Sequence, residues 1–236
     1  MIEFLVETGS TNADLIARLR AGERPGEGHW LVTDRQTAGR GRQGRKWSDG
    51  SGNFMGSTLV RPGPNDPAAH SLSLVAGVAV YEAILPFCAT PDALRLKWPN
   101  DVLLGDAKLC GILLEREGEA VVVGIGVNLA SVPDVPDRKT IALSALGPAP
   151  DRDAFAERLA DTFSTEIERW RTYGLEPLIR RWTAIGTPVG TPITVHEPDT
   201  TVARGRFAGL EADGTLRLRL DDGSVRAIHA GDVILA

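Results

Sequence analysis

Cysteine is almost missing from this chain: its 236 residues include only two, Cys88 and Cys110. The two stand far apart in apolar surroundings and form no C-x-x-C motif, so we interpret them as buried, reduced thiols of a cytoplasmic protein. The four histidines show no H-E-x-x-H or other metal-ligand spacing. The sequence therefore predicts neither a disulfide framework nor a metal site built from histidine and cysteine.

The chain also lacks a strong excess of charge and a recognisable targeting segment. Lys and Arg total 26 against 31 Asp and Glu, a net charge of -5, which argues against a bulk nucleic-acid binder. Glu3 interrupts the N-terminal segment, which is therefore no signal sequence, and no apolar run approaches the length of a membrane span. With 42% hydrophobic and 24% charged residues, the composition is that of an ordinary globular protein, with no membrane partner expected.

Apolar and β-branched runs predict a first unit that mixes strands with helices and a second unit made of strands alone. In the first unit the predicted strands lie at residues 2–6, 30–33, 54–60, 94–97, 102–104, 109–114 and 120–127. In the second unit they lie at residues 193–195, 203–207, 215–220 and 225–229. We expect a large domain over 1–186 and a domain of about fifty residues over 187–236, which packs on the first because it is too small for much of a core.

Helical spacing of apolar residues predicts helices after Ser10, over 70–87, after a cap at Asp151 or Asp153, and over 175–182. At the first of these, Thr11 and Asp14 have the spacing of a capping box. The second is rich in Ala, Leu and Val with few charges, which indicates a mostly buried helix. The proline-rich segment 133–150 is expected to be a loop.

A glycine- and arginine-rich loop, residues 36–47, reads Gln-Thr-Ala-Gly-Arg-Gly-Arg-Gln-Gly-Arg-Lys-Trp. Glycine lets backbone N–H groups approach an anion closely, and guanidinium groups match phosphate or carboxylate oxygens. We interpret the loop as an anion site or a basic interaction patch, with a flexible solvated loop as an alternative of equal weight. Its glycines also satisfy G-x-G-x-x-G, but no apolar helix follows the third glycine, so we reject a dinucleotide-binding fold.

Four further segments place polar groups at strand or helix ends. Residues 97–101 (Lys-Trp-Pro-Asn-Asp) and 108–115 (Lys-Leu-Cys-Gly-Ile-Leu-Leu-Glu) surround turns in an apolar hairpin, where polar groups can converge on a ligand. On these residues alone a tight turn with solvated lysines is slightly favoured, with Asp101 as a turn or cap residue. The Asn of 124–128 (Gly-Ile-Gly-Val-Asn) can bind a ligand or satisfy its own turn. Residues 10–12 (Ser-Thr-Asn) are equally ambiguous, since one of them is expected to cap a helix.

The combination and order of these segments resemble biotin–protein ligases. Ser-Thr-Asn, Gly-Arg-Gly-Arg-x-Gly-Arg-x-Trp, Lys-Trp-Pro-Asn-Asp, Lys-x-x-Gly-Ile-Leu-x-Glu and Gly-x-Gly-x-Asn occur in the family's order over essentially the whole chain. Each motif is weak alone, but their joint order and spacing are specific. The resemblance implies an α+β fold: a mixed β-sheet flanked by helices, of the class II synthetase and lipoate ligase type, with a small C-terminal SH3-like β-barrel.

The resemblance also implies an ATP-dependent ligase that uses biotin, ATP and Mg²⁺. The biotin carboxylate attacks the α-phosphate of ATP to give biotinyl-adenylate, and a lysine of a biotin carboxyl carrier domain then attacks the mixed anhydride. The residues implied to bind biotin are Ser10, Thr11, Asn12, Gln36, Arg40, Gly41, Arg42 and Lys108. The residues implied to bind ATP or the adenylate are Arg40, Arg42, Arg45, Trp47, Lys97, Asn100 and Asn128.

Three of these side chains are implied to take part in the chemistry. Lys108 would approach the biotin carboxylate and the α-phosphate, where charge builds up in the first transition state. Arg42 belongs to the loop that closes over biotin and the adenylate, and Asp101 would position either the incoming lysine or Mg²⁺. Trp47 is expected on the adenine side. No metal ligand is assigned, because Mg²⁺ would arrive with ATP.

The same residues bear on DNA binding, on dimerisation and on two alternative functions. The first strand begins at Ile2, which leaves no room for the helix-turn-helix domain of some members, so we expect a ligase that binds no DNA. Many relatives dimerise through a sheet edge, and the sequence leaves a homodimer open. A lipoate–protein ligase is disfavoured by the arginine-rich loop and by Lys-Trp-Pro-Asn-Asp. A non-enzymatic basic-loop binding module is disfavoured by the net charge of -5 and by the few aromatics near the loop.

Overall fold

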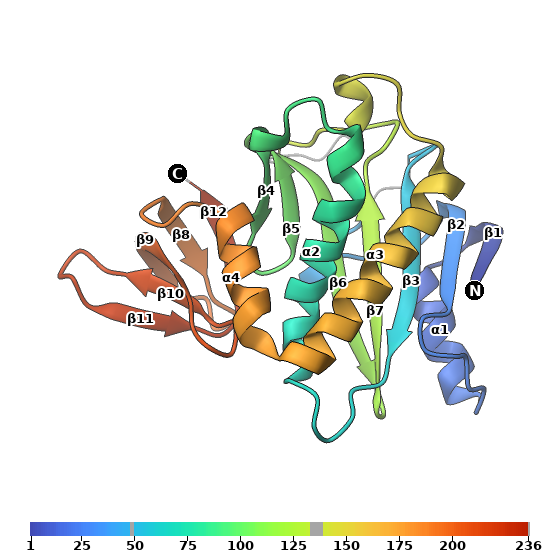
Figure 1. Cartoon of the computed structure of the whole chain (residues 1–236), viewed down its shortest axis with the longest axis horizontal. Helices are drawn as coiled ribbons and strands as arrows, with labels where there is room; N and C mark the ends of the chain where they lie inside the picture. Colours follow the sequence, from blue (N-terminus) through green and yellow to red (C-terminus); the bar gives the residue numbers. More distant parts are fainter. Residues whose placement is uncertain (48–49, 133–138, 236) are drawn as a thin grey trace.

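The computed structural model describes residues 1–47, 50–132 and 139–235, which form two β-sheets with helices around the larger one (Figure 1). Within these residues the larger sheet has seven strands in the order β1 (Ile2–Thr8), β2 (Trp30–Gln36), β3 (Phe54–Val60), β7 (Ala120–Val127), β6 (Ala107–Glu117), β5 (Asp101–Leu104) and β4 (Leu94–Lys97). β1 and β2 run parallel, whereas the other neighbours are antiparallel. The sheet is therefore mixed, as predicted.

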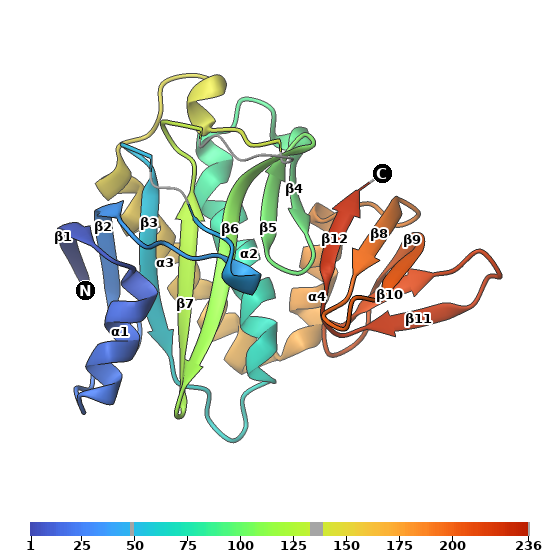
Figure 2. The same cartoon turned by 180° about the vertical axis from the view of Figure 1, so that it is seen from behind.

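Helices cover both faces of this sheet. The described α-helices are α1 (Thr11–Arg20), α2 (Leu72–Ile84), α3 (Arg152–Tyr173) and α4 (Leu175–Ile185). α2 and α3 lie on one face, and α4 leads from α3 toward the smaller sheet (Figure 1). α1 lies on the opposite face of the sheet, which is turned toward the viewer in Figure 2. Short 3-10 turns lie at Arg42–Gly44, Ala69–Ser71, Leu85–Phe87, Pro91–Ala93 and Leu143–Ala145.

The pleat of the strands divides the core between the two faces. On β2, Trp30 and Val32 belong to the main core, which includes the buried residues of α2 and α3, whereas Leu31 packs with Leu15 and Ile16 of α1. Successive side chains of a strand point to opposite faces, so one strand serves both layers. The polar loops connect these layers at the ends of the strands.

α2 has the composition of a membrane span but is a core helix. With its flanking 3-10 turns it forms a stretch, Ala69–Phe87, that is long and apolar enough to cross a membrane. The expectation that no apolar run reaches such a length was therefore wrong. α2 packs against α3 and the sheet, and Leu72, Val75 and Ala79 are fully buried. A helix that is apolar on all sides can be covered by protein instead of lipid.

The starts of two helices test the predicted capping residues. Asp151, one of the two candidates for α3, accepts backbone N–H groups at 2.9 and 3.0 Å and is the cap. At α1 the cap is Ser10, whose hydroxyl accepts a backbone N–H at 3.5 Å. The capping box of Thr11 and Asp14 was wrong, because the Thr11 side chain joins a buried polar cluster and the Asp14 carboxylate accepts from Thr8.

The segment 133–150, expected to be a loop, lies partly outside the described residues, since 133–138 are not described. Its described remainder contains a single 3-10 turn and no strand or α-helix. This agrees with the expectation for residues 139–150. The segment still shapes the site, because the backbone N–H of Lys108 donates to the carbonyl of Lys139 at 2.9 Å.

The smaller sheet packs directly on the larger domain. Its described strands are all antiparallel, in the order β11 (Val225–Ile228), β10 (Leu216–Arg219), β9 (Val202–Leu210), β8 (Pro192–His196) and β12 (Asp232–Leu235). β12 was not predicted. The rings of Trp182 and Phe207 meet across the junction at 6.3 Å, and the indole N–H of Trp98 donates to the carbonyl of Gly214 at 3.1 Å. The expected fold class is confirmed, whereas the boundary at 186/187 stays a prediction.

Candidate active site

A pocket of about 780 Å³ opens on the α1 face of the seven-stranded sheet. The arginine-rich loop crosses this face in front of β3, β7 and β6 (Figure 2). The pocket is lined by every residue with a predicted binding or catalytic role: Ser10, Thr11, Asn12, Gln36, Arg40, Gly41, Arg42, Arg45, Trp47, Lys97, Asn100, Asp101, Lys108 and Asn128. The fold therefore brings together segments that lie far apart in the sequence.

One end of the pocket holds a buried polar cluster of Thr11, Asn12, Gln36 and Ser57, each less than a tenth exposed. Gln36 Oε1 accepts the backbone N–H of Thr11 at 2.9 Å, and the hydroxyls of Thr11 and Ser57 lie 2.6 Å apart. Ser57 donates to Asn12 Oδ1 at 2.6 Å. These mutual hydrogen bonds hold the side chains in defined orientations, so the cluster can recognise the N–H and C=O groups of a small ring.

Gly124 of β7 makes room for this polar cluster. A Cβ atom at that position would lie 2.3 Å from Asn12 Oδ1, far inside van der Waals contact. The strand glycine therefore lets the amide of Asn12 lie directly against the sheet. The group that approaches the backbone closely at this glycine is thus a side chain of the protein itself.

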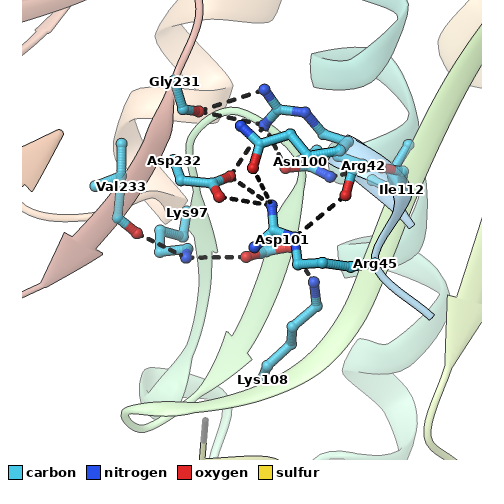
Figure 3. Close-up of polar contacts among 11 residues, drawn as sticks. Arg42, Arg45, Lys97, Asn100, Asp101, Lys108, Ile112, Gly231, Asp232 and Val233 are labelled. Carbon is cyan, nitrogen blue, oxygen red and sulfur yellow. Dashed lines mark hydrogen bonds and ion pairs between the residues drawn. The ribbon is translucent and has the colours of Figure 1, made fainter. Parts of the chain in front are cut away.

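The other end of the pocket holds a cationic cluster, Lys97, Lys108 and Asp101 (Figure 3). The Asp101 carboxylate lies 2.5 Å from Nζ of Lys108 and 2.9 Å from Nζ of Lys97. Burial opposes its ionisation and is the largest single influence, but the charges of Lys108 and Lys97 together outweigh it and lower the pKa of Asp101 to about 2. Two ammonium groups around one carboxylate leave a net positive charge, which suits an anionic ligand.

A β-bulge aims Lys108 into the pocket. Asp101 pairs with Gly111, but Leu103 pairs with Lys108, so β6 contains one residue more than β5 between these pairs. The extra residue reverses the alternation of side chains, and Leu109 is buried in the core while Lys108 faces the same side as Gly111. Without the bulge, Lys108 would point toward the helix layer.

The loop arginines Arg42 and Arg45 bridge the two domains (Figure 3). Arg42 Nη1 donates to Asn100 Oδ1 at 3.1 Å and to the carbonyl of Gly231 at 3.3 Å. Arg45 Nη2 lies 2.6 Å from Oδ2 of Asp232. Burial lowers the pKa of the Arg42 guanidinium from its usual range, and the nearby carboxylate of Asp232 acts in the opposite direction. The loop thus presents half-buried cations beside the cationic cluster.

The Trp47 ring lies across the floor of the pocket between its two ends. A Cβ atom at Gly126 would lie 2.3 Å from Cζ2 of Trp47, and one at Gly111 would lie 3.0 Å from Cζ3. These two glycines are direct partners on β6 and β7, and they form a flat surface under the indole. Lys108 Nζ lies 5.9 Å from the ring centre. The expected position of Trp47 beside adenine stays a prediction.

Asn128 carries an unused acceptor in this pocket. Its side chain is 1% exposed, and its Nδ2 donates to the carbonyl of Ile141 at 3.1 Å. Its Oδ1 is buried and finds no hydrogen-bond partner among the described residues. Because an unpaired buried acceptor is costly, this oxygen is a natural site for a ligand N–H donor.

Sequence reasoning missed three residues of the site: Ser57, Glu115 and Asp232. Ser57 completes the polar cluster, Glu115 accepts from Asn12 Nδ2 at 2.7 Å, and Asp232 pairs with Arg45. Glu115 ends the Lys-x-x-Gly-Ile-Leu-x-Glu motif, so a signal was present. Ser57 on an apolar strand and Asp232 in the C-terminal domain carry no comparable motif.

The two ends of the pocket offer complementary chemistry. One end can hydrogen-bond a neutral polar ring, and the other can neutralise a carboxylate together with phosphate groups. Among the described residues no group of three His, Cys, Asp or Glu side chains could hold a metal ion. The arrangement fits a reaction that joins two anions without a protein nucleophile.

Comparisons with known proteins agree with this geometry. Residues 10–129 match the biotin/lipoate A/B protein ligase family, and residues 189–236 match the biotin protein ligase C terminal domain. The chain is 39% identical over 226 residues to the biotin–[acetyl-CoA-carboxylase] ligase of Paracoccus denitrificans, covering 91% of this chain and 92% of that protein. It is 36% identical to the ligase of that name from Mycobacterium tuberculosis, covering 99% and 88%.

A solved structure extends the similarity to the whole architecture. The biotin protein ligase from Aquifex aeolicus in complex with biotin and ATP has a TM-score of 0.86 to this chain. Its sequence is 26% identical, and the alignment covers 100% of this chain and 98% of that one. Family matches, relatives and fold agree, and the structural alignment covers the full length. The chain therefore belongs to the biotin/lipoate A/B protein ligase family, and within it to the biotin protein ligases.

Proposed function

We propose that this chain is a biotin–[acetyl-CoA-carboxylase] ligase, which activates biotin with ATP and transfers it to a lysine of a biotin carboxyl carrier domain. The observation that supports this function most strongly is that one pocket has two different ends. A polar cluster able to hydrogen-bond a small ring lies at one end, and the cationic cluster lies at the other. Biotin has the matching shape, because a ureido ring and a carboxylate stand at the two ends of its molecule.

In the first half-reaction, a carboxylate oxygen of biotin attacks the α-phosphorus of ATP. The bond from that phosphorus to the bridging oxygen breaks, and pyrophosphate leaves. Lys108 neutralises the approaching carboxylate and α-phosphate, and Lys97, Arg42 and Arg45 offset the charge of the phosphates. Arg40 and Gly41 belong to the loop that covers the product and keeps water from the mixed anhydride.

Side-chain amide groups hold the adenylate near its adenine base and its phosphates. The unpaired Oδ1 of Asn128 accepts a hydrogen bond from an N–H donor of the adenine base. Asn100, which links the loop to β6 through Arg42 and the carbonyl of Ile112, sets the position of the loop beside the phosphates. Trp47 adds an aromatic surface on the adenine side.

In the second half-reaction, the amine of the carrier lysine attacks the acyl carbon, and AMP leaves with the electrons of the broken C–O bond. The amine loses a proton to the solvent as the amide forms. Asp101 is the carboxylate of the cationic cluster, and it is placed to accept an N–H of the neutral amine of the incoming lysine, because the net positive charge of the cluster disfavours a third ammonium group. We assign Asp101 this orienting role.

The described residues do not provide a metal site of their own. We infer that Mg²⁺ arrives with ATP, because this ion keeps most of its waters and binds to phosphates with few protein ligands. The partner is the carrier domain of a carboxylase, and the reaction places the enzyme in the cytoplasm, where ATP and reduced thiols coexist.

A lipoate ligase is the nearest alternative, and the polar cluster argues against it. The dithiolane ring of lipoate has no N–H or C=O groups, so it would leave the buried polar groups of Thr11, Asn12 and Gln36 without ligand partners. The ureido ring of biotin supplies both donors and an acceptor. Substrate choice between these two acids is therefore part of the test.

The decisive experiment is biotin-dependent exchange of labelled pyrophosphate into ATP. Wild-type protein should exchange with biotin and not with lipoate. Lys108→Ala should lower the rate by roughly a hundredfold or more, the size of effect typical of a lost transition-state charge contact. Lys139→Ala is a matched control, since Lys139 is an exposed lysine paired with Asp106 outside the pocket. Absence of exchange by folded wild-type protein would refute the function, and exchange with lipoate alone would change the substrate.

A further inference from the structure

Glu115 on β6 lies just behind the polar cluster, outside the pocket lining. Its Oε2 accepts a hydrogen bond from Nδ2 of Asn12 at 2.7 Å, and its Oε1 lies 3.9 Å from Nη2 of Arg40. The side chain is 28% exposed. It therefore touches the groups that surround the ligand and not the ligand space itself.

The carboxylate of Glu115 determines which way the Asn12 amide faces. A carboxylate accepts hydrogen bonds and cannot donate them, so the NH₂ group of Asn12 must point toward Glu115. The amide oxygen then points toward Ser57, in agreement with the 2.6 Å contact between Ser57 Oγ and Asn12 Oδ1. The amide also lies against the backbone of Gly124, which leaves no room for it to shift toward the strand.

The orientation of the Asn12 amide in turn fixes the direction of the hydrogen bonds that the hydroxyl groups of Ser57 and Thr11 make. Ser57 has one proton and gives it to Asn12, so Ser57 must accept the proton shared with Thr11 across their 2.6 Å contact. The Thr11 hydroxyl also lies 3.2 Å from Gln36 Oε1, but its single proton serves the shorter contact with Ser57. The donated protons of the Asn12–Ser57–Thr11 chain therefore point toward Glu115. The hydroxyl oxygen of Thr11 is left with free lone pairs, while Gln36 Oε1 is occupied by the backbone N–H of Thr11 and leaves Nε2 as a donor.

We propose that Glu115 is a positioning and specificity residue, which directs the Asn12–Ser57–Thr11 hydrogen bonds so that the pocket presents acceptors to the two N–H groups of a ureido ring. This inference rests on the proposed function, since it concerns how biotin is recognised. A neutral amide at position 115 could donate as well as accept. It would let the Asn12 amide turn over and the whole chain reverse, so that donors would face the ring N–H groups.

Two substitutions separate this role from simple packing. Glu115→Gln keeps the size of the side chain but loses the acceptor-only chemistry, whereas Glu115→Asp keeps the carboxylate and shortens the side chain. If hydrogen-bond direction matters, Gln should raise the Kd for biotin about tenfold, the effect of a misdirected buried hydrogen bond, and Asp should raise it less. If Glu115 only fills space, the order should be the reverse, with Asp worse than Gln.

Glu117 provides the matched control. It lies two residues further along β6, so its side chain projects on the same face, and it pairs with the exposed Arg20 at 2.7 Å. Glu117→Gln should leave the Kd for biotin unchanged. The ion pair between Glu115 and Arg40 is long and exposed, so a contribution from it should vanish at about 0.5 M salt, where screening is strong. The effect of hydrogen-bond direction should persist.

The experiment is titration of the whole protein with biotin by calorimetry, together with pyrophosphate exchange at varied biotin and varied ATP. The expected result for Glu115→Gln is a raised Kd and KM for biotin, a KM for ATP within about twofold of wild type, and a Kd effect that survives high salt. An unchanged Kd, a weaker effect for Gln than for Asp, or equal changes in both KM values would overturn the inference. Wild-type protein without biotin binding or exchange would instead overturn the proposed function.

Discussion

Asp101 and Lys108 form the shortest bridge between two strands of the site, with 2.5 Å between the carboxylate oxygen and Nζ. The contact exists because the bulge in β6 turns Lys108 to the face that Asp101 occupies on β5. Asp101 thus holds Lys108 at the end of the pocket where the biotin carboxylate is proposed to arrive. A preset cation needs no reorganisation when the anions approach.

The free energy of unfolding at acid pH should depend on the ion pair between Asp101 and Lys108. The pKa of Asp101 is lowered to about 2 from the usual 3.8 of an aspartate, so the ionised carboxylate stabilises the folded state above pH 4, and this contribution is lost as pH falls through 2. At neutral pH it amounts to about 2 kcal/mol, from roughly 1.4 kcal/mol per pKa unit. Urea unfolding from pH 7 to pH 3 should show a loss about 1 kcal/mol larger for wild type than for Asp101→Asn.

The test is the difference in pH dependence between wild type and Asp101→Asn, because the other carboxylates contribute equally to the unfolding free energy of both proteins. Parallel pH dependences of the unfolding free energy in wild type and Asp101→Asn would show that the lysines do not lower the pKa of this group. Activity should be insensitive to Asp101 ionisation between pH 6 and 8, since the group stays charged there. A loss of exchange activity in Asp101→Asn at neutral pH would then reflect lost positioning.

The close contact between the Trp47 ring and Gly126 predicts the effect of adding one methyl group at position 126. Gly126→Ala places a Cβ atom 2.3 Å from Cζ2 of Trp47, so the indole must leave the floor of the pocket. The other tryptophans are all buried: Trp30, Trp98, Trp170 and Trp182. Emission should therefore shift to the red, reporting Trp47 alone, and biotin affinity should fall about tenfold because the pocket floor is overpacked.

Gly63→Ala is the control for this substitution, because a Cβ there would meet nothing closer than 3.8 Å. Tryptophan emission and biotin titration measure the two effects in one preparation. Unchanged emission in Gly126→Ala would mean that the indole does not rest on Gly126 in solution. A red shift with unchanged biotin affinity would mean that the floor is not part of the ligand site.

The contact of Arg45 with Asp232 predicts how the C-terminal domain influences ATP binding. The carboxylate of Asp232 lies 2.6 Å from Arg45 and 3.9 Å from Arg42, so the phosphates of ATP must compete with it for both guanidinium groups. Asp232→Asn removes this competition and one negative charge. The KM for ATP should fall about threefold, the scale of a partly exposed ion pair, with the KM for biotin unchanged.

Asp221→Asn is the charge-matched control in the same domain, because Asp221 is exposed in a turn away from the pocket. Pyrophosphate exchange at varied ATP measures the difference. A raised KM for ATP in Asp232→Asn would contradict the prediction. It would show that the C-terminal domain holds the loop in place for the nucleotide and does not compete with it.

The sequence by itself determined the residues of the site more fully than their arrangement. Each motif is local: glycines next to arginines in one loop, and an Asn–Asp turn between two strands. Local spacing also sufficed for β3 and narrowed the cap of α3 to Asp151 or Asp153, because turns, caps and alternation depend on neighbours along the chain. The capping box at Thr11 failed for the opposite reason, since a buried contact with Ser57 outcompeted a local one.

Only the tertiary structure decided how the motifs work together. Strict alternation along β6 would place Lys108 on the face of Cys110, and the bulge that reverses this depends on pairing with β5. The roles of Ser57, Glu115 and Asp232 depend on strands and domains that meet after folding. The physical reason is that strand register and domain packing arise from contacts distant in sequence, which no local pattern specifies.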